Sequence, residues 1–231
     1  MLTLEGLELT QGGFRLRADL SVDKGKRVAI IGPSGGGKSS LLAAIAGFLP
    51  PSRGRVFWEG RDITKDAPGA RPVSIVFQDN NLFPHLTAAQ NVGLGLRPDL
   101  RLSQAQNGAV EAALARVGLA GLGARKPGAL SGGQIARVAL ARMLLRARPL
   151  VLLDEPFAAL GPALKAEMLA LVENLVDEAE ATLLMVSHEP QDARQIAQQT
   201  ILVAGGVAHP PRDTAALFAD PPAALRDYLG N

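Results

Sequence analysis

One segment of the chain has the residue types of a phosphate-binding loop. The pattern G-x-x-x-x-G-K-[ST] is met by residues 32–39, GPSGGGKS, between an apolar run at 28–31 and an apolar stretch at 41–48. Glycines let backbone N–H groups turn toward phosphate oxygens, and the following helix adds the positive end of its dipole. Lys38 would pair with the β- and γ-phosphates, and the Ser39 hydroxyl would bind Mg²⁺. We therefore favour a nucleotide-binding loop over a flexible glycine-rich turn.

A pair of carboxylates is the expected complement of such a loop. Asp154 and Glu155 directly follow the apolar run 150–153, and α/β sheets place their ligands at the C-terminal ends of strands. Asp154 would hold Mg²⁺ through water, and Glu155 would act as the general base on the attacking water. Taken alone, such a pair is more often a turn or a helix cap. The phosphate-binding loop favours the catalytic interpretation.

Two kinds of hydrophobic pattern predict the strands that position these residues. Residues 14–22 alternate apolar and polar side chains, which is typical of a half-buried antiparallel strand, and residues 2–9 suggest its partner across a turn at Gly12-Gly13. Continuous apolar runs indicate parallel strands that are covered on both faces. These runs are residues 28–31, 73–77, 150–153 and 182–186. Residues 55–58 should extend the antiparallel part, so the predicted class is α/β with a parallel core sheet and an N-terminal antiparallel β subdomain.

Helical patterns lie between and after these strands. An amphipathic helix should follow Pro162, a favoured first-turn residue. Residues from about 87 to 147 contain no convincing strand and several glycines, which predicts an inserted subdomain of short helices. The tail around Pro210-Pro211 and Pro221-Pro222 is read as short terminal helices separated by prolines. We expect one nucleotide-binding domain over residues 1–231 with this helical insertion inside it.

Composition excludes several classes of protein. The chain has 231 residues and no cysteine, which excludes a disulfide scaffold and a thiol nucleophile. Its net charge is only +2, which disfavours a nucleic-acid-binding surface. The longest apolar stretch, 138–153, is interrupted by three arginines, and the N-terminus lacks the features of a secretory signal. We expect a soluble protein of the cytoplasm.

A second anion site identifies the family that the chain resembles. Ser131 is a plausible N-cap, and Gly132 and Gly133 would expose the N-terminus of the helical stretch 135–145. The segment Leu130-Ser131-Gly132-Gly133-Gln134, together with the loop at 32–39, resembles the signature and Walker A motifs of the ATP-binding cassette (ABC) family. The resemblance covers essentially the whole chain. It implies a P-loop NTPase fold of the ABC type.

The resemblance also implies the roles of individual residues. Gln78 matches the glutamine that contacts Mg²⁺ or the water, Asp154 and Glu155 match the Walker B aspartate and the catalytic glutamate, and His188 matches the switch histidine at the γ-phosphate. Catalysis would therefore rest on Glu155, His188 and Gln78, and Mg²⁺ on Ser39, Gln78 and Asp154. The residues expected to bind ATP are Gly32, Pro33, Ser34, Gly35, Gly36, Gly37, Lys38, Ser39 and Ser40. The signature, Leu130 to Gln134, would close over the ATP of a second copy in a head-to-tail dimer.

Two positions depart from the family pattern. Gln11 stands where an aromatic residue usually stacks on adenine, so Phe14 is the nearest candidate for that contact. Gly161 stands where the family commonly has an aspartate that helps to link the two ATP sites. We expect slower or less coupled hydrolysis from the second change, and weaker or differently supplied adenine stacking from the first.

Transport is implied by the kind of cassette that the chain resembles. A single cassette without a membrane span is similar to the detached ATP-binding subunits of bacterial importers, and segments 71–74, 78–83, 91–96 and 183–188 most resemble those of thiamine importers. This implies a transmembrane permease, indirectly a solute-binding protein, and a peripheral position on the cytoplasmic face of the inner membrane. The alternatives are an importer for another small solute, or a soluble ABC ATPase acting on nucleic acid or ribosomes, which the absence of heptads and of a basic stripe disfavours.

The segment after Gln78 offers a candidate contact with the permease. Leu82, Phe83 and Leu86 are apolar residues in an otherwise polar stretch. They would either pack inward on the helical insertion or form a docking groove for a cytoplasmic helix of the permease, and the sequence leaves both open.

Overall fold

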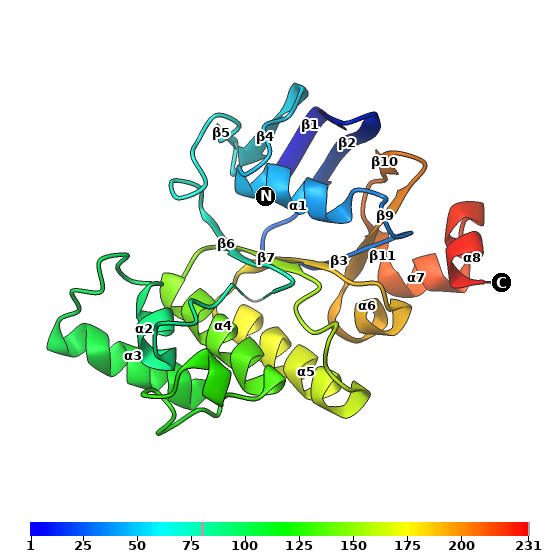
Figure 1. The fold of residues 1–231 in the computed structure, drawn as a ribbon. Helices are drawn as coiled ribbons and strands as arrows, with labels where there is room; N and C mark the ends of the chain where they lie inside the picture. The colour runs from blue at the N-terminus through cyan, green and yellow to red at the C-terminus, as the bar shows by residue number, and fades with distance from the viewer. Residues whose placement is uncertain (80, 231) are drawn as a thin grey trace.

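The computed structural model, which describes residues 1–79 and 81–230 apart from the side chain of Gln11, is built around a mixed sheet (Figure 1). One part of this sheet is antiparallel. β1 (Leu2–Gln11) lies between β2 (Phe14–Val22) and β4 (Arg53–Trp58), and β5 (Arg61–Asp62) pairs with β4. Every second residue of β2 is buried from Leu16 to Val22, so the predicted half-buried strand and its partner are confirmed.

The other part of the sheet is parallel and forms the core. Its strands run in the order β9 (Gln199–Ala204), β3 (Arg27–Ile31), β8 (Thr182–Val186), β7 (Leu150–Asp154) and β6 (Val73–Val76). The four predicted core strands are confirmed, whereas β9 was not predicted. The short β10 (Val207–Ala208) joins β9 to β2, and β11 (Arg212–Asp213) pairs with β9.

The core strands are apolar on both faces because two clusters cover them. On β7, Leu150 and Leu152 belong to the cluster that packs against the antiparallel part and α1 (Lys38–Ala46). The alternate residues Val151 and Leu153 belong to the cluster that packs against α4 (Gly132–Arg146) and α5 (Pro162–Glu178). All five residues of β7 and of β8 are consequently buried, which explains their continuous apolar sequences.

Several helices lie between β6 and β7 (Figure 1). Those after β6 are α2 (Ala88–Gly93), α3 (Gln104–Arg116), a 3₁₀ turn (Pro127–Ala129) and α4 (Gly132–Arg146). α5 (Pro162–Glu178) follows β7 and begins at the predicted proline. α4 packs against both β6 and α5, and Val76 of β6 shares a buried cluster with residues of α2, α3 and α4. A helical subdomain with boundaries at about 87 and 147 stays a prediction.

The C-terminal segment closes the opposite end of the molecule. α6 (Pro190–Ile196) follows β8, and α7 (Thr214–Ala219) and α8 (Ala223–Leu229) are the predicted terminal helices. In Figure 1 these three helices lie at one end of the sheet, away from α2 and α3. No helix in the described part of the chain is long and apolar enough to cross a membrane.

Candidate nucleotide site and the groove beside it

The loop between β3 and α1 requires glycine at two positions. Gly32 has a φ of 145°, and a Cβ there would lie 2.0 Å from the carbonyl oxygen of Val203. Gly37, the N-cap of α1, has a φ of 94°, and a Cβ there would lie 2.3 Å from the Phe14 ring. Only glycine combines this backbone conformation with such close neighbours. The two glycines therefore let the loop pass close to β9 and Phe14 before α1 begins at Lys38.

Lys38 is held inside this loop. Its side-chain Nζ donates to the carbonyl oxygens of Gly32, at 2.8 Å, and Pro33, at 2.9 Å. The residue is only 4% exposed. Burial lowers the pKa of Lys38, and the carboxylates of Glu155 and Asp154 oppose that shift. These two acids therefore favour the charged ammonium, which is the form that would pair with phosphate.

The end of β7 brings an acid next to the loop. The Ser39 hydroxyl donates to Asp154 Oδ1 at 2.9 Å. Burial is the main cause that raises the pKa of Asp154, while the bond from Ser39 acts in the opposite direction. A hydroxyl and a carboxylate oxygen this close are hard ligands of the kind that Mg²⁺ prefers. Among the described residues, no group of three or more His, Asp or Glu side chains is arranged to hold a metal ion by itself.

Glu155 and His188 meet at the ends of neighbouring strands. Glu155 follows β7 and has a φ of 47°, a left-handed conformation that is uncommon outside glycine. Its carboxylate contacts Nε2 of His188, which follows β8. Because β7 and β8 are parallel neighbours, their C-terminal ends bring together residues that are 33 positions apart. Backbone strain of this kind is typical of functional sites.

A polar hollow of about 470 Å³ contains most of the predicted nucleotide-binding and catalytic residues. We call it the phosphate hollow, and it is lined by Phe14, Ser34, Gly35, Gly37, Lys38, Ser39, Ser40, Gln78, Glu155 and His188. Asp154 touches it through Ser39, and Gly32, Pro33 and Gly36 belong to the loop without lining it. Phe14 lies in the hollow, as its proposed contact with adenine requires. The side chain of Gln11 lies outside the described residues.

The predicted signature lies apart from this hollow. None of the described residues Leu130, Ser131, Gly132, Gly133 and Gln134 lines the phosphate hollow. Ser131 caps α4: its hydroxyl accepts from the Gln134 backbone N–H, and the Gln134 side chain accepts from the Ser131 N–H. This capping box confirms the predicted N-cap and leaves the start of α4 at the surface.

Comparison with known proteins assigns the family. Residues 16–158, more than half of the chain, match the family described as ABC transporter. The chain belongs to the ABC transporter family. The family assignment confirms the predicted fold class and identifies the chain as a cassette ATPase.

Two relatives and one solved structure extend this assignment. The thiamine import ATP-binding protein ThiQ of Cereibacter sphaeroides is 64% identical over 230 residues, and the match covers 100% of both chains. ThiQ of Escherichia coli K12 is 52% identical over 206 residues, or 89% of each chain. The ATP-binding cassette MJ0796, bound to ADP and Pi in a dimeric post-hydrolysis state, aligns with a TM-score of 0.80 at 29% identity, covering 93% of this chain and 99% of that one.

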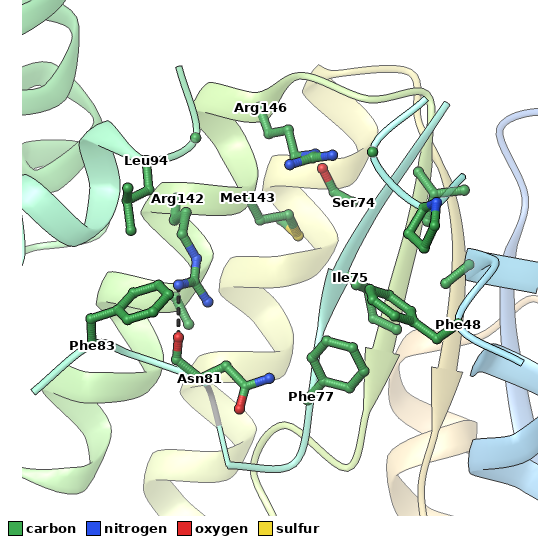
Figure 2. Close-up of a pocket in the computed structure, with 16 residues that line it drawn as sticks. Phe48, Ser74, Ile75, Phe77, Asn81, Phe83, Leu94, Arg142, Met143 and Arg146 are labelled. Atoms are coloured by element: carbon green, nitrogen blue, oxygen red, sulfur yellow. Dashed lines mark hydrogen bonds between the residues drawn. The ribbon is translucent and has the colours of Figure 1, made fainter. Parts of the chain in front are cut away.

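A second hollow of about 410 Å³ lies between the end of α1, β6 with the segment after it, and α4 (Figure 2). We call it the aromatic groove. Its lining includes Phe48 beyond α1, Phe77 after β6, Phe83 and, from α4, Arg142 and Arg146. Phe48 and Phe77 meet edge to face with ring centroids 5.5 Å apart, and Phe83 stands on the opposite wall. Phe48 is 55% exposed and Phe83 47% exposed, which is unusual for side chains of this size.

The three apolar residues singled out after Gln78 take different positions. Leu82 packs against the buried cluster of the helical segment, and Leu86 is half-buried. Phe83 is exposed at the groove, and its backbone is held by Asn91, whose side chain accepts from the Phe83 N–H at 2.8 Å and donates to its carbonyl at 3.1 Å. The inward interpretation is therefore correct for Leu82, and Phe83 has the exposure that docking requires.

Arginines give the aromatic groove a positive wall. Arg142 donates to the Asn81 carbonyl at 2.8 Å, and Arg146 lies beside Ser74 in Figure 2. Burial lowers the pKa of both arginines. Within the described residues, the Nε of Arg146 and the hydroxyl of Ser74 are buried without a hydrogen-bond partner. Such groups favour a partner that carries an acceptor or a negative charge.

One contact of the site was missed by the sequence reasoning. The hydroxyl of Tyr228 in α8 donates to the backbone carbonyl of His188 at 2.5 Å. The two residues are 40 positions apart and share no motif, so no local signal could have found the pair.

Proposed function

We propose that this chain is the ATP-hydrolysing subunit of a thiamine importer and drives uptake through a separate membrane permease. Thiamine is inferred as the cargo from the 64% identity, over all of both chains, with a thiamine import ATP-binding protein. No residue of this subunit is proposed to touch thiamine. The cargo would be selected by its partners, and an importer for another small solute is the alternative.

The phosphate hollow supports a division of roles among its residues. Lys38 would neutralise the β- and γ-phosphates of ATP, and the backbone N–H groups of residues 32–40 would hold their oxygens. Glu155 would accept a proton from the attacking water, while His188 and Gln78 would orient that water and the γ-phosphate. Glu155 and His188 are in contact, and Gln78 lines the same hollow, which fits their acting on one phosphate.

Ser39 and Asp154 fit a bound Mg²⁺. Their oxygens lie 2.9 Å apart at the mouth of the loop, and Gln78 lines the hollow that they border. A divalent ion at this place would neutralise charge that develops on the phosphates. Measuring how ATP hydrolysis depends on Mg²⁺ therefore tests the proposed ligands directly.

Two copies of the chain would complete each ATP site. The signature, Leu130 to Gln134, lies apart from the phosphate hollow of its own chain, and Ser131 and Gly132 are exposed. The backbone N–H groups at the start of α4 would then be available to the phosphates bound by a second copy. The dimeric state of the cassette MJ0796 supports this arrangement.

The aromatic groove would dock a cytoplasmic helix of the permease. Exposed Phe48 and Phe83 offer apolar contact, and Arg142 and Arg146 would attract an acidic side chain on that helix. This contact would hold the chain as a peripheral protein on the cytoplasmic face of the inner membrane. A solute-binding protein on the far side would deliver the cargo to the permease.

Uptake of labelled thiamine tests this function. Cells that lack the chain should lose uptake, and the wild-type chain should restore it, whereas Glu155→Gln should not, because it lacks the general base. Exposed Glu180 provides a matched control, since Glu180→Gln should restore uptake fully. Normal thiamine uptake in the deletion strain, with loss of another solute, would overturn the cargo and leave the ATPase role standing.

A further inference from the structure

The only tyrosine of the chain reaches the candidate catalytic histidine from the C-terminal helix. Tyr228 lies on α8, and its hydroxyl donates to the backbone carbonyl of His188 at 2.5 Å. Its ring packs against a small buried cluster that includes Ile31 of β3, Ala193 of α6 and Leu225 of α8. Apolar residues of three elements therefore anchor the tyrosine ring, and its hydroxyl reaches the loop after β8.

The neighbours of His188 are held from the other side of the loop. The Ser187 hydroxyl donates to Asp192 Oδ2 at 2.6 Å and accepts from the Glu189 N–H at 3.0 Å. Lys165 of α5, which is buried, donates to the Glu189 carboxylate at 2.5 Å. These bonds fix the residues on both sides of His188, and the Tyr228 hydroxyl holds the carbonyl of His188 itself.

The His188 side chain depends on its backbone for its position. It is 42% exposed, so packing restrains the imidazole weakly. Its contact with Glu155 at the phosphate hollow requires a defined direction of the side chain, which the orientation of the His188 backbone sets. A group that fixes this backbone also fixes where Nε2 points.

We propose that Tyr228 is a positioning residue for ATP hydrolysis, which holds the backbone of His188 so that the imidazole faces Glu155 and the γ-phosphate. This inference rests on the proposed role of His188. Tyr228 acts through the histidine and does not touch the nucleotide. The C-terminal helix α8 thereby becomes part of the catalytic apparatus, although it lies outside every nucleotide-binding motif of the chain.

The electrostatic surroundings keep the tyrosine in its donor form. Burial raises the pKa of Tyr228, and the carboxylates of Glu155 and Glu189 raise it further. The hydroxyl therefore stays protonated at neutral pH and donates to His188 throughout the working range.

The first test removes only the hydroxyl. Tyr228→Phe should lower the kcat of ATP hydrolysis about 3- to 10-fold with KM unchanged, because without this one hydrogen bond the imidazole of His188 is held less often in its reactive direction. Thr214→Val is the matched control, because it also removes one C-terminal hydroxyl, which contacts Thr200 at 2.9 Å. It should lower the unfolding temperature without changing kcat. A kcat loss in Tyr228→Phe that is matched by Thr214→Val would overturn the proposal in favour of general stability.

A second measurement reports on His188 directly. The chain has three histidines, His85, His188 and His209, whose imidazole NMR signals can be assigned by substitution. Tyr228→Phe should move the signals of His188 and leave the other two in place. Unmoved His188 signals together with an unchanged kcat would overturn the proposal.

His188→Ala separates this inference from the function on which it rests. If the function is correct, this variant should lose most ATPase activity, and adding Tyr228→Phe to it should cause no further loss. Wild-type activity in His188→Ala would overturn the proposed role of the histidine. A large loss in His188→Ala with a silent Tyr228→Phe would overturn only the role of the tyrosine.

Discussion

The phosphate hollow and the aromatic groove have similar volumes, about 470 and 410 Å³, but they are built in opposite ways. Glycines and charged side chains at strand ends form the first. Exposed aromatic rings and the arginines of α4 form the second. They meet after β6, where Phe77 lines the groove and the next residue, Gln78, lines the hollow. One peptide bond thus separates a surface suited to a partner from a site suited to phosphate.

The two hollows draw mainly on different elements of the fold. The polar part of the phosphate hollow comes largely from one loop and from residues at the ends of β7 and β8. The groove takes residues from positions 46 to 146, on α1, β6, the segment after it, and α4. A substitution in one hollow should therefore leave the other intact.

The largest effect is expected in the phosphate hollow. Glu155→Gln should lower kcat by about 10²–10⁴, or about 3–5 kcal/mol, because the proposed general base is lost. ATP affinity and membrane association should stay as in the wild type. Steady-state ATPase and ATP-binding assays measure both, with Glu180→Gln as the control. A kcat that survives would show that the base lies elsewhere.

The next effect is expected in the aromatic groove. Phe83→Asp should reduce association with permease-containing membranes by about tenfold or more, because it buries an unpaired charge against an apolar partner. ATP binding should be unchanged. Val207→Asp is the matched control, since Val207 is another exposed apolar residue and does not line the groove. Sedimentation with membranes measures the association of both variants. Full association of Phe83→Asp would reject docking at this groove.

A smaller effect is expected at the edge of the phosphate hollow. Phe14→Leu should weaken ATP binding by about 0.5–1.5 kcal/mol, since the ring that would stack on adenine is replaced while apolar packing is kept. Binding of inorganic triphosphate, which has no base, should not change. Calorimetric titration with both ligands tests this. Equal loss for both ligands would mean that Phe14 shapes the loop through Gly37 and does not recognise adenine.

The smallest effect on stability is expected at Gly161. This residue is the N-cap of α5, has an extended conformation with ψ 158°, makes no side-chain cap, and has open space where a Cβ would stand. Gly161→Asp should therefore add a cap and raise the free energy of unfolding by a few tenths of a kcal/mol.

The same variant tests the departure of Gly161 from the family pattern. Gly161→Asn supplies a similar cap without the charge, so a change in ATPase rate or cooperativity that occurs only in Gly161→Asp would assign the effect to the acid. An unchanged rate and cooperativity in both variants would show that the missing aspartate is unimportant for hydrolysis.

The helical segment shows what local sequence patterns can predict and what they cannot. The capping box of Ser131 and Gln134 is a local arrangement, so the start of α4 followed from four consecutive positions. The packing of α4 on β6 and α5 did not follow, because it depends on which faces meet after folding. β9 was missed although its apolar run 201–204, between Thr200 and Gly205-Gly206, is as long as the predicted runs 28–31 and 150–153, so a local signal for this strand was present.

The sequence by itself determined the chemistry of this protein: the phosphate-binding loop, the acid pair after β7 and the signature are each runs of consecutive residues. Such sites can be read locally because phosphate is held by successive backbone N–H groups and helix starts. Only the tertiary structure decided that Phe48 and Phe83 share one groove and that Tyr228 holds His188. The members of these two pairs are 35 and 40 positions apart, and folding brings them together through packing, which no local pattern encodes.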